Sequence, residues 1–327
     1  MKRIPELDYL KGILILLVIS FHLVWFEQLH PFAKQVVYTF HMPGFLLVSG
    51  YLMNVGKPPK DFLRTLLWLA VPYIIMESGY IVMASLLPIN EHIDHLTPAV
   101  FLDRLLLHPL GPYWYLHTLI ICGAIYYLIH NSQFIIHNSL LGRLGRVFFI
   151  GLAYYAVSYI LNNLLPLKGV GGSFSLSSAL YFLAGAAIRQ SGTDFIRFFR
   201  PFKGGWGIIS LIAFALLISL PSREGLVGSV LIAYTAISSL LWLYTYTPPK
   251  GGRGGSFFGR NSLLLYVFSP IFTILCKQFV PYLQFDPTGL LFLFVSLIVC
   301  VGGSLLIARL MDLTGTSRFF FGRKAIN

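Results

Sequence analysis

The sequence predicts an all-α polytopic membrane protein, a bundle of about ten transmembrane helices with both termini in the cytoplasm. Three observations support this fold class: the composition, the spacing of the apolar runs and the distribution of the basic residues. The 327 residues are 56% hydrophobic and only 11% charged, and the mean hydropathy is +0.75. In a typical soluble domain, about a quarter of all residues are charged. We therefore expect a single membrane-embedded domain over residues 1–327.

Ten apolar runs are long enough to cross the roughly 30 Å of hydrocarbon in a bilayer. Pro43, Pro72 and Pro270 fall inside three of them, and neighbouring helices can accommodate such prolines. The sixth and seventh runs are the shortest. The expected spans lie near 10–29, 35–54, 65–87, 112–130, 147–165, 174–190, 205–221, 226–246, 262–281 and 288–309.

The basic residues give this map an orientation. With the N-terminus in the cytoplasm, 19 of the 24 Lys and Arg residues fall on the cytoplasmic side and 5 on the other side, as the positive-inside rule requires. The net charge of +12 is thus explained by membrane topology, and we expect membrane lipids rather than nucleic acid as partners. The five outer residues are Lys34, Arg104, Lys168, Arg223 and Lys277.

Two connections between the spans resemble ligand sites on first reading. Region 88–111 carries His92, His95 and His108 among several acids, but His108 is distant from the other two, so we favour an amphipathic lid and expect no metal. The GGRGG stretch at 251–255 lacks the Gly-Lys-Ser/Thr ending of a phosphate loop. We interpret it as a flexible basic connection.

One helical stripe in the first span carries three polar side chains. Eleven residues turn a helix through about three full turns, so Lys11 and His22 share a face about 16 Å apart. Asp8 lies within about 60° of that face. Ionisable groups inside a span are costly and usually functional. We therefore expect His22, deep in the bundle, to be a functional residue rather than a hydrogen-bonded packing residue.

Further polar and aromatic residues lie in the neighbouring spans. Glu77 is an acid deep in the third span, and we expect it to pair with His22, His41 or a tyrosine hydroxyl. A purely structural, hydrogen-bonded acid is the alternative. Trp114 and Tyr115 can stack on a sugar or on adenine, or they can anchor the helix at the membrane interface.

These residues occur in sequence blocks that resemble the acyltransferase 3 family of integral-membrane O-acyltransferases. Asp8, Lys11 and His22 match its opening block in RIPELDYLKGILILLVISFH at 3–22. The second block, FHMPGFLLVSGYL at 40–52, matches at His41, Met42, Pro43, Ser49 and Gly50. Weaker agreement occurs at Arg64 before VPYI, PYWYL at 112–116, YFLAGAAI at 181–188 and GRNSLLLYVFSP at 259–270.

The chain departs from the family pattern at three positions. Asp61 replaces the first of two arginines three residues apart, Leu110 replaces a serine before the tryptophan of the fourth span, and Ser269 replaces a histidine. The differences concern contacts to the acyl donor and the class of acceptor. None of the three positions is among the residues that match the opening block, Asp8, Lys11 and His22.

The resemblance implies an O-acyltransferase, specifically an O-acetyltransferase, in the plasma (inner) membrane. It would move an acyl group from cytoplasmic acyl-CoA, acetyl-CoA in particular, to a hydroxyl of an envelope glycan, an exported glycan or a lipid-linked sugar, without a permanently bound cofactor. A transporter of lipid-linked sugars with an intramembrane His/Glu proton relay is the alternative, and a sensor or scaffold is a weaker one.

Each role in acyl transfer can be assigned to residue types that suit it. An imidazole accepts the hydroxyl proton, a carboxylate orients the imidazole, and cations hold the phosphates of CoA. We assign the catalytic role to His22, Asp8 and Glu77, donor binding to Lys11, Lys60 and Arg64, and acceptor binding to His41, Ser49, Trp114 and Tyr115.

Overall fold

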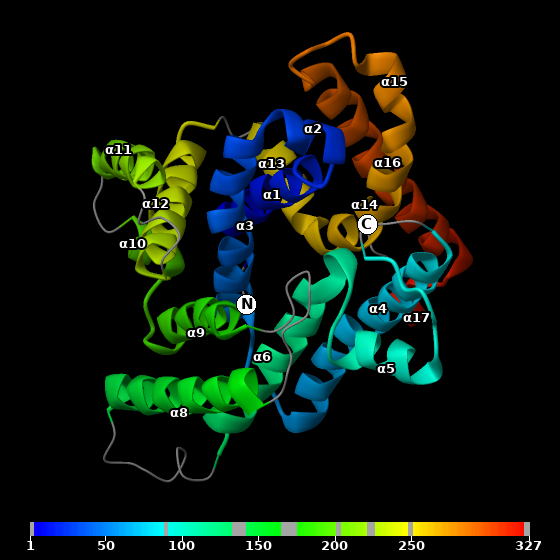
Figure 1. The fold of residues 1–327 in the computed structure, drawn as a ribbon. Helices are drawn as coiled ribbons and strands as arrows, with labels where there is room; N and C mark the ends of the chain where they lie inside the picture. Colours follow the sequence, from blue (N-terminus) through cyan, green and yellow to red (C-terminus); the bar gives the residue numbers. More distant parts are fainter. Residues whose placement is uncertain are drawn as a thin grey trace. The chain divides into compact units, whose positions relative to one another are not determined.

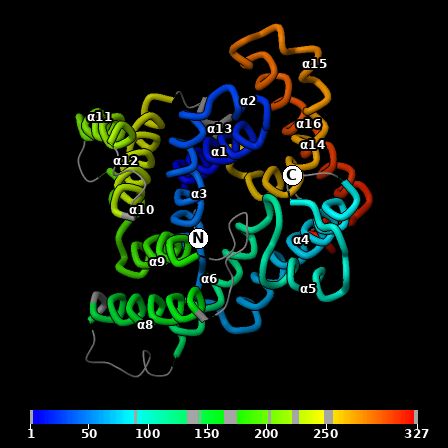
Figure 2. Tube along the Cα trace, viewed as in Figure 1, coloured from blue at the N-terminus to red at the C-terminus, as the bar shows by residue number. Residues whose placement is uncertain are grey.

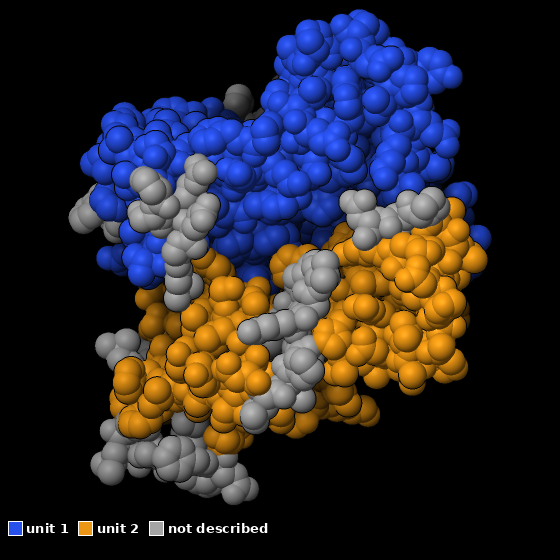
Figure 3. Space-filling view, in the orientation of Figure 1, with its two compact units in different colours: residues 1–48, 194–316, 325–327 blue, residues 49–193, 317–324 orange. Residues whose placement is uncertain are grey.

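The computed structural model describes residues 3–87, 91–132, 142–164, 175–200, 204–220, 226–247 and 251–323. Every regular element in these ranges is a helix (Figure 1). The chain divides into two compact units, of which unit 1 comprises residues 1–48, 194–316 and 325–327 and unit 2 comprises residues 49–193 and 317–324 (Figure 3). The chain leaves unit 1 within one helix and returns to it at Asp194. Figure 2 traces the chain through its helices from the blue N-terminus to the red C-terminus.

Unit 1 contains the N-terminal helices of the chain and the helices between residues 195 and 314. Helix α3 begins in unit 1 and ends in unit 2. The elements are α1 (Pro5–Ser20), α2 (Val24–Leu29), α3 (Pro31–Leu52), α10 (Phe195–Phe199), α11 (Trp206–Ser219), α12 (Leu226–Tyr244), α13 (Gly251–Arg260), α14 (Ser262–Cys276), η3 (Lys277–Phe279), α15 (Val280–Leu283) and α16 (Leu290–Thr314).

Unit 2 contains the central part of the chain and one short helix near its C-terminus. Its core is aromatic, since Tyr126, Tyr154 and Phe182 are buried against one another. Its elements are α4 (Pro59–Leu86), α5 (Pro98–Leu106), η1 (Gly111–Tyr113), α6 (Trp114–His130), α8 (Arg143–Leu164), α9 (Leu176–Gln190) and α17 (Ser317–Phe320).

Glycines let helices approach closely within each unit, as is common between membrane helices. In unit 1, a Cβ added to Gly259 of α13 would lie 1.6 Å from the carbonyl oxygen of Asp8 in α1. In unit 2, a Cβ added to Gly50 of α3 would lie 2.1 Å from the carbonyl oxygen of Phe182 in α9. The interpretation of GGRGG as a flexible connection was wrong, because residues 251–255 form the first half of α13.

Five helical segments in the described part of the chain are long and apolar enough to span a membrane. They are Pro59–Leu86, Pro98–His130, Val227–Tyr244, Ser262–Leu283 and Leu290–Thr314. Large apolar side chains such as Phe294 and Leu313 of α16 are exposed on them, which suits contact with lipid better than contact with water. The all-helical membrane fold is confirmed at this level, and the count of ten spans stays a prediction.

The predicted orientation can be tested by labelling at the C-terminal end. Arg323 is exposed and Cys122, Cys276 and Cys300 are all buried, so we expect a membrane-impermeant maleimide to report only introduced cysteines. Arg323→Cys should react only after the cytoplasmic side is opened, whereas Lys277→Cys, exposed at the predicted outer side, should react in intact cells. Labelling of Arg323→Cys in intact cells would contradict the ten-span map.

Candidate active site

His22 lies in a turn between two helices, which corrects the expectation of one helix over residues 10–29. Helix α1 ends at Ser20 and α2 begins at Val24. The Ser20 hydroxyl donates to the Leu16 carbonyl at 2.8 Å, and the N–H of His22 is shared between the Val18 and Ile19 carbonyls at 3.1 and 3.2 Å. The bonds of the His22 N–H satisfy carbonyls that have no partner inside the helix at its C-terminal end, and the Ser20 hydroxyl adds a second bond to a carbonyl one turn earlier.

The His22 side chain is also more accessible than expected. It is exposed, whereas the flanking Phe21 and Leu23 are buried. The imidazole lies among many atoms of the protein but keeps free surface, because it occupies a turn and not the interior of one continuous span. The physical reason is that the turn directs the two apolar neighbours into unit 1 and leaves the imidazole with free surface, which a group that must reach a substrate requires.

The backbone fixes the tautomer of His22. Its Nδ1 lies 2.7 Å from the Val18 carbonyl oxygen. A carbonyl oxygen can only accept, so Nδ1 must carry the proton. In the neutral ring Nε2 then keeps its lone pair, and the described residues make no hydrogen bond to it. His22 is thus arranged to accept a proton at Nε2.

His41 repeats this arrangement in α3 of the same unit. Its Nδ1 lies 2.7 Å from the Val37 carbonyl oxygen, one helical turn earlier, so Nε2 is again the basic nitrogen. The ring is buried and contacts the ring of Tyr38 with 5.0 Å between centroids. His22 and His41 are close enough to interact electrostatically. The structure therefore brings two imidazoles predicted from separate sequence blocks into one region of unit 1.

Asp8 does not contact His22. It is buried in α1 and binds the guanidinium of Arg3 and, at 3.0 Å, the Nζ of Lys11. One carboxylate between two cations leaves the cluster of Arg3, Asp8 and Lys11 with one excess positive charge, and Glu6 lies in the same turn of α1. This arrangement gives Asp8 the geometry of a group that holds Lys11 in place, and Lys11 is the residue expected to bind the donor.

Lys60 and Arg64 are both exposed at the start of α4 in unit 2. They are four residues apart, so they lie on one face of the helix, about one turn apart. No ion pair to either of them occurs among the residues that the structure describes. Both cations are therefore free to bind an anion.

Ser49 and Tyr115 meet in unit 2. Their hydroxyl oxygens are 2.6 Å apart, and Tyr115 is buried. Trp114 is half-buried beside Tyr115. Three of the residues expected to bind an acceptor therefore come together at the start of α6.

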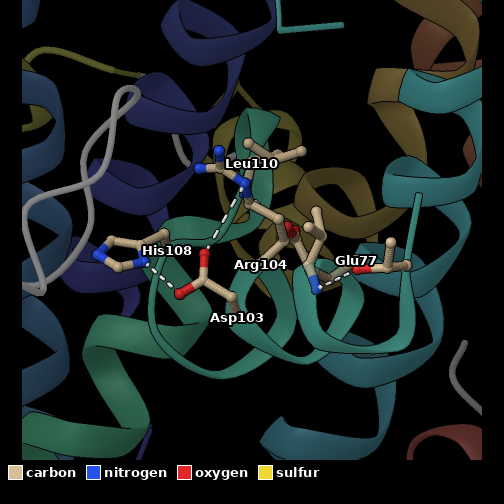
Figure 4. A network of polar contacts seen from close by, with 7 residues as sticks. Glu77, Asp103, Arg104, His108 and Leu110 are labelled. Atoms are coloured by element: carbon tan, nitrogen blue, oxygen red, sulfur yellow. Dashed lines mark hydrogen bonds and ion pairs between the residues drawn. The ribbon is translucent and has the colours of Figure 1, made fainter. Parts of the chain in front are cut away.

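Glu77 binds a backbone amide rather than a side chain. Its Oε1 accepts the N–H of Leu110 at 2.6 Å (Figure 4). Its Oε2 is buried and has no hydrogen-bond partner among the described residues. The expected bond to His22, His41 or a tyrosine hydroxyl is not observed within that part of the chain. Near it, Asp103 accepts a hydrogen bond from Nδ1 of His108 at 2.8 Å (Figure 4).

Two polar residues with clear structural contacts were not singled out from the sequence. Arg189, in the last turn of α9, donates to the Tyr51 and Leu52 carbonyls at the end of α3, both at 3.1 Å. The sequence feature that could have marked Arg189 is its position directly after the YFLAGAAI block at 181–188. Glu91 accepts the N–H of Gly111 at 2.7 Å. Nothing in the spacing of residues 91 and 111 indicates that bond. No group of three metal-ligating side chains occurs in the described ranges.

Comparison with known protein families identifies the chain. The family model Acyl_transf_3, described as an acyltransferase domain, matches residues 4–309. The chain belongs to the acyltransferase 3 family. Comparisons with curated proteins and with solved structures gave no match.

Sequence blocks that carry this acyltransferase resemblance contact one another within each unit. In unit 1, Gly259 of the GRNSLLLYVFSP block packs on Asp8 of the first block. In unit 2, Gly50 of the second block packs on Phe182 of YFLAGAAI, and Ser49 bonds to Tyr115 of PYWYL. The family match and the apolar helices make the chain a multi-pass membrane acyltransferase.

Proposed function

We propose that the protein is an O-acetyltransferase of the plasma membrane that transfers an acetyl group from cytoplasmic acetyl-CoA to a hydroxyl of an envelope or exported glycan. The observation that carries this proposal is the tautomer of His22. An exposed imidazole with Nδ1 protonated and Nε2 unoccupied is the form that a general base needs for a hydroxyl substrate. Membership of the acyltransferase 3 family supports the reaction class.

In the proposed reaction, Nε2 of His22 takes the proton of the acceptor hydroxyl. The hydroxyl oxygen attacks the thioester carbonyl carbon, a C–O bond forms, and the C–S bond breaks when the tetrahedral intermediate collapses. The imidazolium then returns its proton to the departing CoA thiolate. The Val18 carbonyl holds Nδ1–H throughout, so the charged ring is stabilised by a backbone acceptor in place of a triad carboxylate.

Transfer can be measured with the purified chain. We expect radiolabelled acetyl-CoA to yield free CoA and a labelled sugar when octyl glycosides of glucose, galactose and N-acetylglucosamine are offered as acceptors. Release of CoA that depends on the acceptor supports the enzyme. Movement of a lipid-linked sugar across proteoliposomes without acetyl-CoA, and no transfer, would support the transporter instead.

Donor binding gives a second prediction. Lys60 and Arg64 are unpaired within the described chain and suited to the phosphates of CoA, so Arg64→Ala should weaken acetyl-CoA binding about 10- to 100-fold. Lys11→Ala should have a similar effect on donor binding. The variant should still fold, because the buried Asp8 carboxylate keeps Arg3 as a partner. Equilibrium binding of labelled acetyl-CoA is the measurement.

The matched control for these variants is Lys277→Ala. It removes the same charge from an exposed residue at the predicted outer side of the membrane, and donor affinity should not change. If Lys11→Ala and Arg64→Ala also bound acetyl-CoA normally, the cations would serve membrane topology alone.

A further inference from the structure

The turn before α6 is anchored by two carboxylates that come from elsewhere in the chain. The N–H of Leu110 donates to Oε1 of Glu77 at 2.6 Å, and the N–H of the next residue, Gly111, donates to Oε2 of Glu91 at 2.7 Å. Glu77 lies in α4, and Glu91 lies in the connection that follows it. Two consecutive backbone amides are therefore each held by a carboxylate.

These bonds supply what the local sequence lacks. The first N–H groups of a helix have no partner inside the helix and are usually satisfied by a capping side chain. Neither Leu110 at the start of η1 nor Tyr113 at the start of α6 provides one. Glu77 and Glu91 thus act as distant caps for η1, which leads directly into α6.

The position of Glu91 is itself fixed. Its carboxylate lies close enough to the hydroxyl of Tyr80 to interact with it electrostatically, and the Tyr80 ring lies against Gly111, where an added Cβ would come within 2.4 Å of it. Gly111 has φ +57°, a conformation that side chains other than glycine's disfavour. Tyr80, Glu91 and Gly111 consequently form one contact set that defines the path of the turn.

This path determines where the aromatic segment begins. Trp114 and Tyr115 are the first two residues of α6, directly after the anchored turn. Tyr115 reaches Ser49 at 2.6 Å, a length that a small displacement of the start of α6 would break. A change at Glu91 should therefore be transmitted to Trp114 and Tyr115 without direct contact.

We propose that Glu91, together with Glu77, is a positioning residue that sets acceptor binding through Trp114 and Tyr115. The inference rests on the proposed function, in which these two aromatic residues contact the sugar. Stacking of a sugar on an aromatic ring depends on the placement of that ring, so a displaced turn weakens binding of the acceptor more than it slows the chemical step.

The first test is kinetic, with labelled acetyl-CoA and the octyl glycoside that the wild-type chain acetylates fastest. Glu91→Ala should raise the acceptor KM about 5- to 20-fold while kcat changes less than about threefold. Glu91→Gln keeps an oxygen acceptor for the Gly111 N–H and should restore KM to within about threefold of wild type. Asp94→Ala is the matched control, since Asp94 lies in the same connection and is exposed.

The second test reads the turn directly, by amide hydrogen exchange of the peptide covering residues 108–116. Glu91→Ala should speed its exchange about 10-fold or more, because the capped amides lose their acceptor. Tyr80→Phe keeps the ring against Gly111 and removes only the Tyr80 hydroxyl that lies near Glu91. A smaller increase in the exchange rate is therefore expected. Peptides from α16 should exchange as in the wild type.

The outcomes separate this inference from the proposed function. Unchanged exchange in Glu91→Ala would overturn the anchoring of the turn. Faster exchange with an unchanged acceptor KM would overturn the positioning role and leave Glu91 a structural cap. Absence of acetyl transfer by the wild-type chain would overturn the proposed function, and this inference with it.

Discussion

Replacing His22 with Asn or Gln is expected to reduce acetyl transfer about 10²- to 10⁴-fold, the usual contribution of a general base. The Asn amide can reproduce the hydrogen bond from Nδ1 to the Val18 carbonyl, whereas the Gln amide extends toward the position of Nε2. Neither side chain accepts a proton at neutral pH. Loss of activity in both variants, with the local hydrogen bond retained in one, therefore isolates the function of Nε2.

The measurement is turnover of labelled acetyl-CoA, with donor affinity and the yield of folded protein determined in parallel. His30→Gln is the matched control, because His30 lies in unit 1 and bonds to the Thr288 carbonyl through its own ring nitrogen. It should retain wild-type turnover. If His22→Gln kept more than about a tenth of wild-type turnover, well above the loss expected for a general base, His22 would not be the base, and His41 would be tested next.

Gly259→Ala is expected to be the most damaging single-methyl change in unit 1. The new Cβ would lie 1.6 Å from the carbonyl oxygen of Asp8 and 2.9 Å from its Cα. These are backbone atoms, which cannot rotate away as a side chain does, so α13 must separate from α1. Overpacking of this kind costs about 1–3 kcal/mol or more. We expect Tm to fall by about 2–5 °C, or folded protein to be lost.

Thermal unfolding of the purified protein in detergent is the measurement, and Gly302→Ala is the matched control. Gly302 lies inside α16 of the same unit, and a Cβ there meets nothing within 4 Å. Because alanine favours helices over glycine, this variant should be as stable as the wild type or slightly more stable. Equal melting temperatures for Gly259→Ala and Gly302→Ala would show that α1 and α13 do not make this backbone contact.

The helices were predictable from the sequence because membrane helices are long apolar runs, and hydropathy measures that property directly. The end of α1 at Ser20 was not predictable in this way. Residues 10–29 are apolar almost throughout, and the helix ends because Ser20 and His22 bond to backbone carbonyls. The helix over the GGRGG segment was not predicted for a different reason, namely that glycine has a low helix propensity.

The sequence nominated the candidate site residues, but it could not give the partners of their side chains. The spacing of Asp8, Lys11 and His22 marked all three, yet only the structure shows that Asp8 pairs with Lys11 rather than with His22. The partner of Glu77 is a backbone N–H, and every residue but proline carries one. Sequence patterns record side chains, so contacts to the backbone leave no trace in them.

The same property makes the two imidazoles tolerant of sequence change. His22 and His41 both obtain their tautomer from a carbonyl four residues earlier, which is present whatever amino acid occupies positions 18 and 37. A carboxylate that orients a histidine can be lost by a single mutation, whereas this orienting group persists as long as the helix does. Substitutions at Val18 and Val37 are therefore free to adjust packing during evolution without altering which nitrogen is basic.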